Sequence, residues 1–423
     1  MLNIITLAVT LLCGLMFTRL TKYLHLSFPD VTVYLLTGLF VGPFCLGTLG
    51  IEGLGFPSMA DVGKLKIISD VALGFIAFSI GAEFKAEKIA KSGKATVIIG
   101  ILQAVTATFL VDLTLILFSK IIGSSLLNIP VCITLGAIAS ATAPAATLMV
   151  VKQYKAKGPV TELLLPIVAL DDAVGLIVFA VSLGVAQAVN GGELSLSGVL
   201  LNPLLEIVAS FVLGTVLGLV MTKLERLFFS SDHRMTMTIA FVLMAIALSS
   251  FEFDLGSVRI SFSSLLVLMI LGTVFCNLSE YSEDIFEKSD HWTAPLYVAF
   301  FVLSGAQLDL SVLKQPIVLT IGLIYILMRC AGKYIGSSVP ARLMKLDGNI
   351  VKYLGITLFP QAGVALGMVN SAQVLGEGNG AIIRNVVLLS VMIYELVGPS
   401  LTKLSLQKAG EIGSEEKSER QTS

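Results

Sequence analysis

The chain has 423 residues, of which 55% are hydrophobic and 13% are charged, and its formal net charge is −1. Soluble domains carry about 25% charged residues, so this composition indicates a membrane protein and excludes an ordinary soluble enzyme. The small net charge also argues against a nucleic-acid partner. The three histidines, His25, His233 and His291, show no ligand spacing, so we expect no metal cofactor and no other cofactor.

Apolar runs long enough to cross a bilayer, about 20 residues each, recur along the chain and predict an all-α membrane protein. The thirteen expected spans lie near residues 2–21, 29–47, 67–83, 95–119, 129–151, 161–188, 198–222, 235–251, 260–277, 292–308, 316–340, 350–373 and 381–403. Residues 1–403 then form a single transmembrane domain. The remaining residues, 404–423, are expected to be a short, charged, disordered cytoplasmic tail.

The basic residues predict the orientation of these spans. Of the 28 lysines and arginines, 20 fall in the odd-numbered loops and the C-terminal tail, six fall on the opposite side, and two lie within a span. Cytoplasmic loops carry the excess of basic residues. We therefore expect a multi-pass protein of the plasma (inner) membrane with its N-terminus outside and its C-terminus in the cytoplasm.

Two adjacent carboxylates, Asp171 and Asp172, stand in the sequence VALDDAVGLIVFA, inside a run that is otherwise apolar from Leu163 to Ala186. A charged side chain at the bilayer centre costs roughly 2.5–3.5 kcal/mol even on forgiving scales. The pair therefore favours a buried ion or proton site over a pair at a helix end or a purely structural pair. Neighbouring helical residues point about 100° apart, so one aspartate can hold the ion while the other holds a basic group of the protein.

Arg329 and Lys333 are the only basic residues deep inside an expected span, and their spacing of four places them on one helix face. They are the expected charge partners of the aspartates, although long basic side chains can also extend to the membrane surface. Lysine releases its proton more readily than arginine, which makes Lys333 the better proton carrier and Arg329 the better fixed charge. Which of the two pairs with Asp171 stays open. Glu395, in YELVGPSL, is a further possible partner for a basic group.

Two expected spans contain a proline in their middle, Pro144 in ATAPAAT and Pro360 in TLFPQAG, where Gln361 follows the proline. Each proline removes a backbone hydrogen bond. The freed carbonyls, the Thr142 hydroxyl and, as a further possibility, the Thr147 hydroxyl are oxygen ligands that suit a small alkali cation. An ordinary kink filled by a neighbouring helix is the alternative.

A weak internal repeat accompanies these breaks. IAFSIGAEF (76–84) resembles AFFVLSGAQL (299–308), and a proline-broken helix follows two spans after each. The copies are seven spans apart, and an odd offset inverts the second copy in the membrane. Inverted repeats with paired broken helices place a substrate site at the bilayer midplane. Chance similarity between helices rich in glycine and alanine is the alternative.

The motifs DDAVGLIVFA, ATAPA, LFPQAGVALG, YELVGPSLTK and YLLTGLFVGP together resemble the cation:proton antiporter superfamily from about residue 29 to residue 411. The paired aspartates resemble its electrogenic sodium–proton branch. The resemblance implies that Asp172 is the transport carboxylate that binds Na⁺, and that Asp171 pairs with a lysine of the eleventh span. It also implies a homodimer in a lipid bilayer, in which a core of spans 3–5 and 10–12 with the aspartate helix rocks against a dimerising panel.

The expected function is therefore exchange of Na⁺, Li⁺ or K⁺ for protons by competition for one carboxylate, with no enzymatic activity. One departure is Ala143, which stands where some relatives carry an acid before the break proline. The alternatives are a potassium/proton exchanger of the potassium-efflux type, whose usual C-terminal nucleotide-binding domain we do not find, and a sodium-coupled organic-anion symporter. A ligand-gated channel is the alternative from another class.

Overall fold

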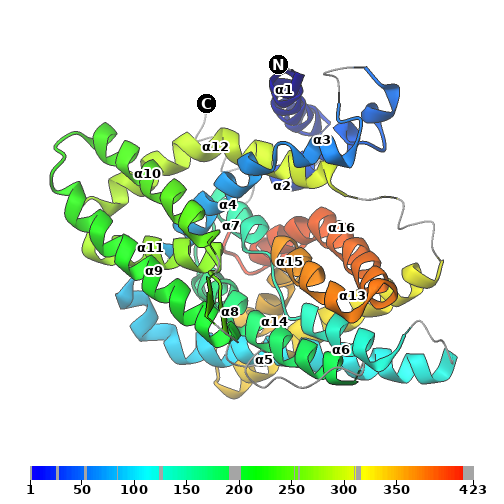
Figure 1. Cartoon of the computed structure of the whole chain (residues 1–423). Coiled ribbons are helices and arrows are strands. Elements are labelled where there is room, and N and C mark those ends of the chain that lie inside the picture. Colours follow the sequence, from blue (N-terminus) through cyan, green and yellow to red (C-terminus); the bar gives the residue numbers. More distant parts are fainter. Residues whose placement is uncertain are drawn as a thin grey trace. The chain divides into compact units, whose positions relative to one another are not determined.

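The computed structural model describes residues 2–24, 28–51, 55–82, 84–122, 127–189, 202–251, 253–255, 258–308, 310 and 316–412. His25 and the end of the expected tail, residues 413–423, lie outside the described residues. Each of the thirteen expected spans contains a helix or two half-helices (Figure 1). The helices up to the first break are α1 (Leu2–Tyr23), α2 (Asp30–Val41), α3 (Met59–Gly63), α4 (Lys66–Gly81), α5 (Ala86–Ile122), α6 (Ile129–Ile138) and α7 (Pro144–Gln153).

The helices that follow are α8 (Pro159–Val189), α9 (Asn202–Glu225), α10 (Ser231–Ser249), α11 (Ser264–Leu278), α12 (Ser282–Ala306), α13 (Pro316–Leu343), α14 (Gly348–Thr357), α15 (Gly363–Ser371) and α16 (Glu377–Lys408). Two short strands, β1 (Phe253–Leu255) and β2 (Val258–Ile260), pair antiparallel between α10 and α11. The hydropathy pattern did not predict this hairpin, because three-residue strands are too short to show a period.

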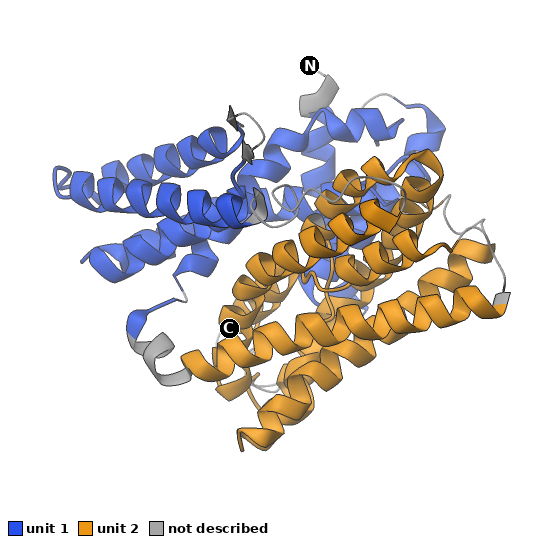
Figure 2. Cartoon of the chain, turned by 60° about the horizontal axis from the view of Figure 1, so that its bottom comes forward, with its two compact units in different colours: residues 1–91, 204–308 blue, residues 92–203, 309–423 orange. Residues whose placement is uncertain are grey.

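The chain divides into two compact units, coloured separately in Figure 2: unit 1 contains residues 1–91 and 204–308, and unit 2 contains residues 92–203 and 309–423. Our expectation that the third and tenth spans join the aspartate helix was wrong. Those spans are α4 and α12, and both belong to unit 1. Unit 2 combines α8, which carries the aspartates, with α5, α13, α16 and the two broken helices.

Close approach of helix backbones at glycines explains why α4 and α12 belong to unit 1. A Cβ atom on Gly38 of α2 would lie 2.8 Å from the backbone nitrogen of Ala306, at the end of α12. A Cβ atom on Gly81 of α4 would lie 2.7 Å from the backbone nitrogen of Thr273 in α11. Small residues let helix backbones approach in this way in membranes, where packing replaces the hydrophobic driving force. If the internal repeat has an offset of seven spans, α2 corresponds to α11 and α4 corresponds to α12. The contact between α2 and α12 then corresponds to the contact between α11 and α4.

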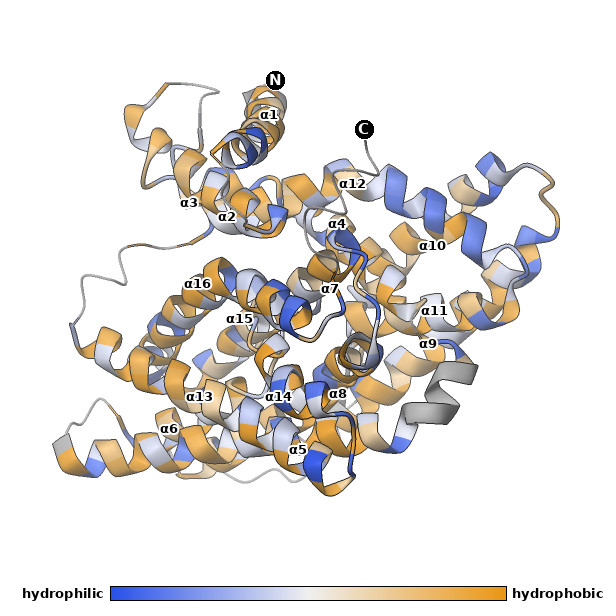
Figure 3. Ribbon diagram, turned by 180° about the vertical axis from the view of Figure 1, so that it is seen from behind, coloured by the Kyte–Doolittle hydropathy of each residue, from blue (hydrophilic) through white to orange (hydrophobic). Residues whose placement is uncertain are grey.

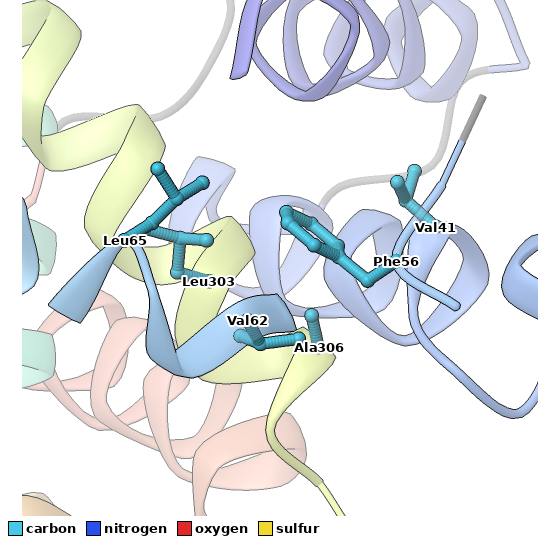
Figure 4. Close-up of a cluster of buried hydrophobic side chains, with 6 residues drawn as sticks. All are labelled: Val41, Phe56, Val62, Leu65, Leu303 and Ala306. Atoms are coloured by element: carbon cyan, nitrogen blue, oxygen red, sulfur yellow. The ribbon is translucent and has the colours of Figure 1, made fainter. Parts of the chain in front are cut away.

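An apolar cluster in unit 1 joins these helices to the segment between α2 and α4. The cluster consists of Val41, Phe56, Val62, Leu65, Leu303 and Ala306 (Figure 4). The backbone N–H of Phe56 donates to the carbonyl of Val41 at 3.0 Å, which brings the segment back onto the end of α2. The loop that separates the second and third spans is therefore packed against α2 and α12.

Seven of the described helices are long and apolar enough to cross a membrane, and they include α5, α8, α13 and α16 of unit 2. Figure 3 shows that hydrophobic residues dominate α13 and α16, whereas hydrophilic residues gather in the first half of α12. The half-helices α6 and α7 have ten residues each, as does α14, and α15 has nine. Each is about half a bilayer long at 1.5 Å per residue, so a pair of them spans the membrane once.

The N-terminus of the aspartate helix α8 is capped by a residue far along the chain, Glu411. Its carboxylate accepts hydrogen bonds from the backbone N–H groups of Val160 and Thr161 at 2.6 and 2.8 Å, and from the Thr161 hydroxyl at 2.6 Å. Gly158 leaves room for this contact, because a Cβ atom there would lie 2.5 Å from the Glu411 carboxyl carbon. Our expectation of a disordered tail from residue 404 was therefore wrong up to residue 412.

Replacing Glu411 with alanine should destabilise unit 2, because it removes the acceptor of two N–H groups and the negative charge at a helix N-terminus. We expect a loss of about 1–2 kcal/mol, measured as a lower unfolding temperature of the purified protein in detergent. Glu162→Ala, at an exposed acid in the same first turn, is the matched control. Equal unfolding temperatures for Glu411→Ala and Glu162→Ala would contradict the capping role.

Candidate ion site

The two broken helices, α6–α7 and α14–α15, cross at their breaks, and we call this place the crossing. The first break separates α6, which ends at Ile138, from α7, which begins at Pro144; the second lies between Thr357 and Gly363. Proline suits the first position of a helix, because its missing N–H would have no partner there. The N–H of Ala143 donates to the carbonyl of Pro360 at 2.8 Å, which joins the two breaks directly.

Arg329 of α13 holds the carbonyls that both breaks leave free. Its Nε donates to Ala139 at 3.0 Å, one terminal nitrogen donates to Ala141 at 2.6 Å, and the other donates to Phe359 at 2.6 Å. The side chain is fully buried, with 0% exposure, so it does not extend to the membrane surface. The C-terminal ends of α6 and α14 are both negative ends of helix dipoles, and the guanidinium compensates them together.

Neutral groups complete this support from the side of the second break. Gln361 donates from Nε2 to the carbonyl of Ile138 at 2.9 Å, and its Oε1 accepts from the Ser390 hydroxyl at 3.3 Å. The Tyr325 hydroxyl lies 3.0 Å from the same Nε2. On α16, the ring of Tyr394 lies 4.6 Å from the Arg329 guanidinium carbon. Gln361 therefore supports the crossing.

Lys333, one turn after Arg329, forms an ion pair with Asp171. Its Nζ lies 2.9 Å from the Asp171 Oδ2 atom, and both side chains have 0% exposure. The same ammonium donates to the Thr142 hydroxyl oxygen at 2.9 Å and to the carbonyl of Ser140. The three protons of the ammonium thus have three acceptors. The structure resolves the choice left open by the sequence: Lys333 contacts Asp171, and Arg329 contacts the backbone of the crossing.

Asp172 has a different environment from its neighbour. Its side chain is 6% exposed, and its Oδ1 atom is buried with no hydrogen-bond partner among the described residues. One turn along α8, Gly175 faces the first break, because a Cβ atom there would lie 3.3 Å from the Ser140 hydroxyl and 3.5 Å from the Met368 methyl group. A buried oxygen of a carboxyl group without a donor is expensive. This oxygen is therefore suited to accept a proton or a cation.

The remaining predicted residues have less specific positions. The Thr142 hydroxyl donates to Asp171 Oδ2, so in this structure it supports the ion pair. The Thr147 hydroxyl donates to the carbonyl of Ala143, the residue just before α7, at 3.5 Å. Glu395 is buried in α16 with 9% exposure, and the described part of the chain includes no ion pair to it.

Sequence reasoning missed several residues that complete the site. Gln103 of α5 donates to Asp171 Oδ1, and it is the only amide side chain within the expected span 95–119. That polar residue in an apolar run was a usable signal. Tyr325, Tyr394 and Ser390 carried no comparable signal, because tyrosine and serine are common in membrane helices.

These contacts make the site a cluster of four charges at the crossing. Arg329 is a fixed positive charge bound to backbone carbonyls, and Lys333 and Asp171 neutralise each other. Asp172 has no opposite charge in direct contact among the described residues. A proton or a bound cation can neutralise its carboxylate. A cation site that can also be protonated needs a group of this kind.

The chain is similar in sequence and fold to known cation/proton antiporters. Residues 7–408 match a family model described as "Sodium/hydrogen exchanger, transmembrane". The chain is 25% identical over 386 residues to the K(+)/H(+) antiporter subunit KhtU of Bacillus subtilis, covering 90% of this chain and 88% of that protein. It is 22% identical over 409 residues to the Na(+)/H(+) antiporter NhaS4 of Synechocystis, covering 95% of each.

Two structures of the sodium proton antiporter MjNhaP1 from Methanocaldococcus jannaschii share the fold. One matches with a TM-score of 0.72 at 17% sequence identity, covering 97% of this chain and 98% of the other. The second, at pH 8, matches with a TM-score of 0.69 at 19% identity and covers 96% and 98%.

Replacing Arg329 with lysine should destabilise the crossing although it keeps the charge. Lysine lacks the planar fork that reaches several acceptors at once, and each buried carbonyl left without a donor costs about 1–3 kcal/mol. We expect the unfolding temperature in detergent to fall by roughly 5 °C or more. Arg342→Lys, at an exposed position of the same helix, should leave it unchanged. A wild-type unfolding temperature for Arg329→Lys would show that the carbonyls do not depend on the guanidinium.

Proposed function

This chain belongs to the sodium/hydrogen exchanger family and is a cation/proton antiporter, and we propose that it exchanges Na⁺ or Li⁺ for protons at Asp172. The observation that carries the proposal is the contrast within the aspartate pair. Asp171 is held by Lys333 at 2.9 Å, whereas Asp172 keeps a buried oxygen without a partner among the described residues. One carboxyl group is structural and the other is free to bind.

Competition for this one carboxyl would couple the two fluxes. A protonated Asp172 is neutral and has lost the charge that attracts a cation, while a cation-bound Asp172 has no room for the proton. The empty, charged form would be disfavoured within the membrane, so each transition across the membrane would carry one of the two ions. Exchange then needs no further gate to prevent leakage.

The charge moved per cycle depends on Lys333. If Lys333 and Asp171 stay paired throughout, one proton replaces one cation and the exchange is electroneutral. If Lys333 releases its proton when the cation binds, two protons exchange for one cation and each cycle moves one net charge. Such a cycle responds to the membrane potential by about 2.3 kcal/mol per 100 mV. We propose the second case, because a buried lysine can change its protonation state whereas an arginine cannot.

We assign transport to unit 2, which contains both broken helices and both aspartates. Unit 1 would then form the panel of a homodimer in the plasma membrane. The excess of basic residues in the odd-numbered loops supports an external N-terminus and a cytoplasmic C-terminus. Labelling of single cysteines in intact cells with an impermeant reagent tests that orientation: cysteines in the even-numbered loops should react, and reaction in the odd-numbered loops instead would reverse it.

K⁺ is the second candidate cation. A relative with 25% identity is named a K(+)/H(+) antiporter subunit, and one with 22% identity is named a Na(+)/H(+) antiporter. Both ions are bound by hard oxygen ligands, so the residues at the crossing suit either in kind. The selectivity therefore has to be measured.

The first functional prediction concerns Asp172. In proteoliposomes that contain a pH-sensitive dye, gradients of Na⁺, Li⁺ and K⁺ should each be tested for proton flux, and Na⁺ and Li⁺ should drive it best. Asp172→Asn should abolish this flux, because a neutral amide neither releases a proton nor balances a cation. Glu162→Gln, at an exposed acid of the same helix, should retain it.

Four results would contradict this proposal. Exchange at the parental rate by Asp172→Asn would remove Asp172 from the mechanism. Strong flux with K⁺ alone would reassign the cation. Cation-driven uptake of an organic anion without proton exchange would instead indicate a symporter, and uncoupled current would indicate a channel.

The second functional prediction concerns the electrical behaviour. Charge movement on a solid-supported membrane should follow the addition of the transported cation to the parent protein. Lys333→Gln should reduce the charge moved per transported cation while some exchange through Asp172 remains, because glutamine has no proton to release. Lys345→Gln, at a position outside the spans, is the control. Cation exchange without charge movement in the parent would establish an electroneutral exchanger.

A further inference from the structure

Three segments of unit 2 meet where α7, α13 and α16 end. The backbone N–H of Lys157, in the turn between α7 and α8, donates to the carbonyl of Glu411 at 3.1 Å. From the turn between α13 and α14, Nδ2 of Asn349 donates to the carbonyl of Ala409 at 3.2 Å. Both turns are therefore bonded to the end of α16. The surface that they form together consists of residues 152–162, 342–352 and 403–412.

This surface carries an excess of positive charge. Its exposed basic residues, which we call the basic patch, are Lys155, Lys157, Arg342, Lys345, Lys352 and Lys408. The exposed acids of the same segments are Glu162 and Asp347, and Asp347 accepts from the backbone N–H of Asn349 at the start of α14. Glu411 is buried and caps α8. Within the described part of the chain, no member of the basic patch forms an ion pair.

Two members of the basic patch adopt a backbone conformation that usually belongs to glycine. Lys155 and Lys345 have φ angles of 48° and 56°. Each follows its helix in the same way: its own N–H donates to the carbonyl three residues earlier, and the next N–H donates to the carbonyl five residues earlier. α16 ends in this same arrangement with Gly410, whose φ angle is 77°. Because a side chain is unfavourable in this conformation, glycine would suit α7 and α13 better.

The helix dipole does not explain the two lysines. A cation near the C-terminus of a helix is favourable, but each of the three helices already has a basic residue in its last turn. These residues are Lys152 in α7, Arg342 in α13 and Lys408 in α16. The additional charges of Lys155 and Lys345 therefore indicate a negative partner outside the described chain.

The basic patch lies where membrane-crossing helices end. α13 and α16 are both long and apolar enough to cross a bilayer. Arg342 and Lys408 are in their last turns, and Lys345 follows α13 directly. The end of such a helix reaches the headgroup region, and clusters of about four to eight basic residues beside it attract anionic lipids. A lipid headgroup is therefore the negative partner that this position favours.

We propose that the basic patch binds the phosphate headgroups of anionic phospholipids, in the leaflet where α13 and α16 end. The phosphates supply the negative charge that the described residues lack there, and lysines bind them as point charges. The turn of Lys157 is bonded to Glu411, which holds the first turn of α8. A lipid that binds only the folded arrangement of these segments stabilises unit 2.

Lys155→Gln/Lys345→Gln tests the proposal, because it removes two charges of the basic patch. Purified protein in a non-ionic detergent is titrated with dioleoylphosphatidylglycerol, and the unfolding temperature is measured at each concentration. We expect this anionic lipid to raise the unfolding temperature of the parent more than zwitterionic dioleoylphosphatidylcholine does. The concentration that gives half of the rise should be about tenfold higher, or more, in the variant. Lys120→Gln/Arg384→Gln, at exposed positions of unit 2 outside the basic patch, should keep the parental value.

If Lys155→Gln/Lys345→Gln does not elute as a folded protein, Lys155→Gly/Lys345→Gly gives the same test, because glycine suits the backbone at both positions. A parental half-rise concentration in the folded variant would overturn the proposal. Equal stabilisation of the parent by the two lipids would also overturn it, as would equal stabilisation by inorganic phosphate at the same concentration.

The C-terminal tail is the competing occupant of the basic patch. Residues 413–423 include the acids Glu415, Glu416 and Glu419. Deletion of these eleven residues keeps Glu411 and should leave the response to dioleoylphosphatidylglycerol in place. A response that appears only after this deletion would show that the tail covers the basic patch, and would overturn the assignment to lipid.

Discussion

The site depends on the satisfaction of backbone carbonyls where two helices unwind within the membrane. Lipid offers no hydrogen bonds, so irregular backbone at this depth needs partners from the protein. Arg329 supplies three donors, Lys333 supplies one, and Gln361 supplies one, to carbonyls that belong to both breaks. The two basic residues of α13 thus hold the framework, and the Oδ1 atom of Asp172, where we propose that the cation binds, accepts no hydrogen bond from the described part of the chain.

These contacts explain why the surroundings of the two aspartates differ although the residues are adjacent. The same lysine that bonds to the backbone also binds Asp171, so the geometry of the crossing and the charge state of the pair are linked. If Lys333 lost one proton, two N–H groups would remain for three acceptors, so the Ser140 carbonyl, the Thr142 hydroxyl or Asp171 would lose its donor. Under the proposed function, proton release would therefore change the contacts that hold the first break.

The sequence predicted the helices, the breaks and the aspartate pair because each has a local signal: an apolar length, a proline within it, or a charge where charge is costly. It did not separate Lys333 from Arg329, since residues four apart share a face and differ only in which atoms they reach. It also placed α4 and α12 in the wrong group. Their grouping comes from glycine contacts with α11 and α2, which depend on the three-dimensional pairing of distant segments.

The cap on α8 has a practical consequence for any work on the C-terminus. Glu411 and Ile412 are buried, and Glu411 holds the first turn of the helix that carries both aspartates. A purification tag or reporter domain fused directly after residue 412 would disturb that turn. A truncation that ends before Glu411 would remove the cap of α8 as well as shorten the chain. Fusions should therefore keep residues 409–412 and begin with a flexible linker.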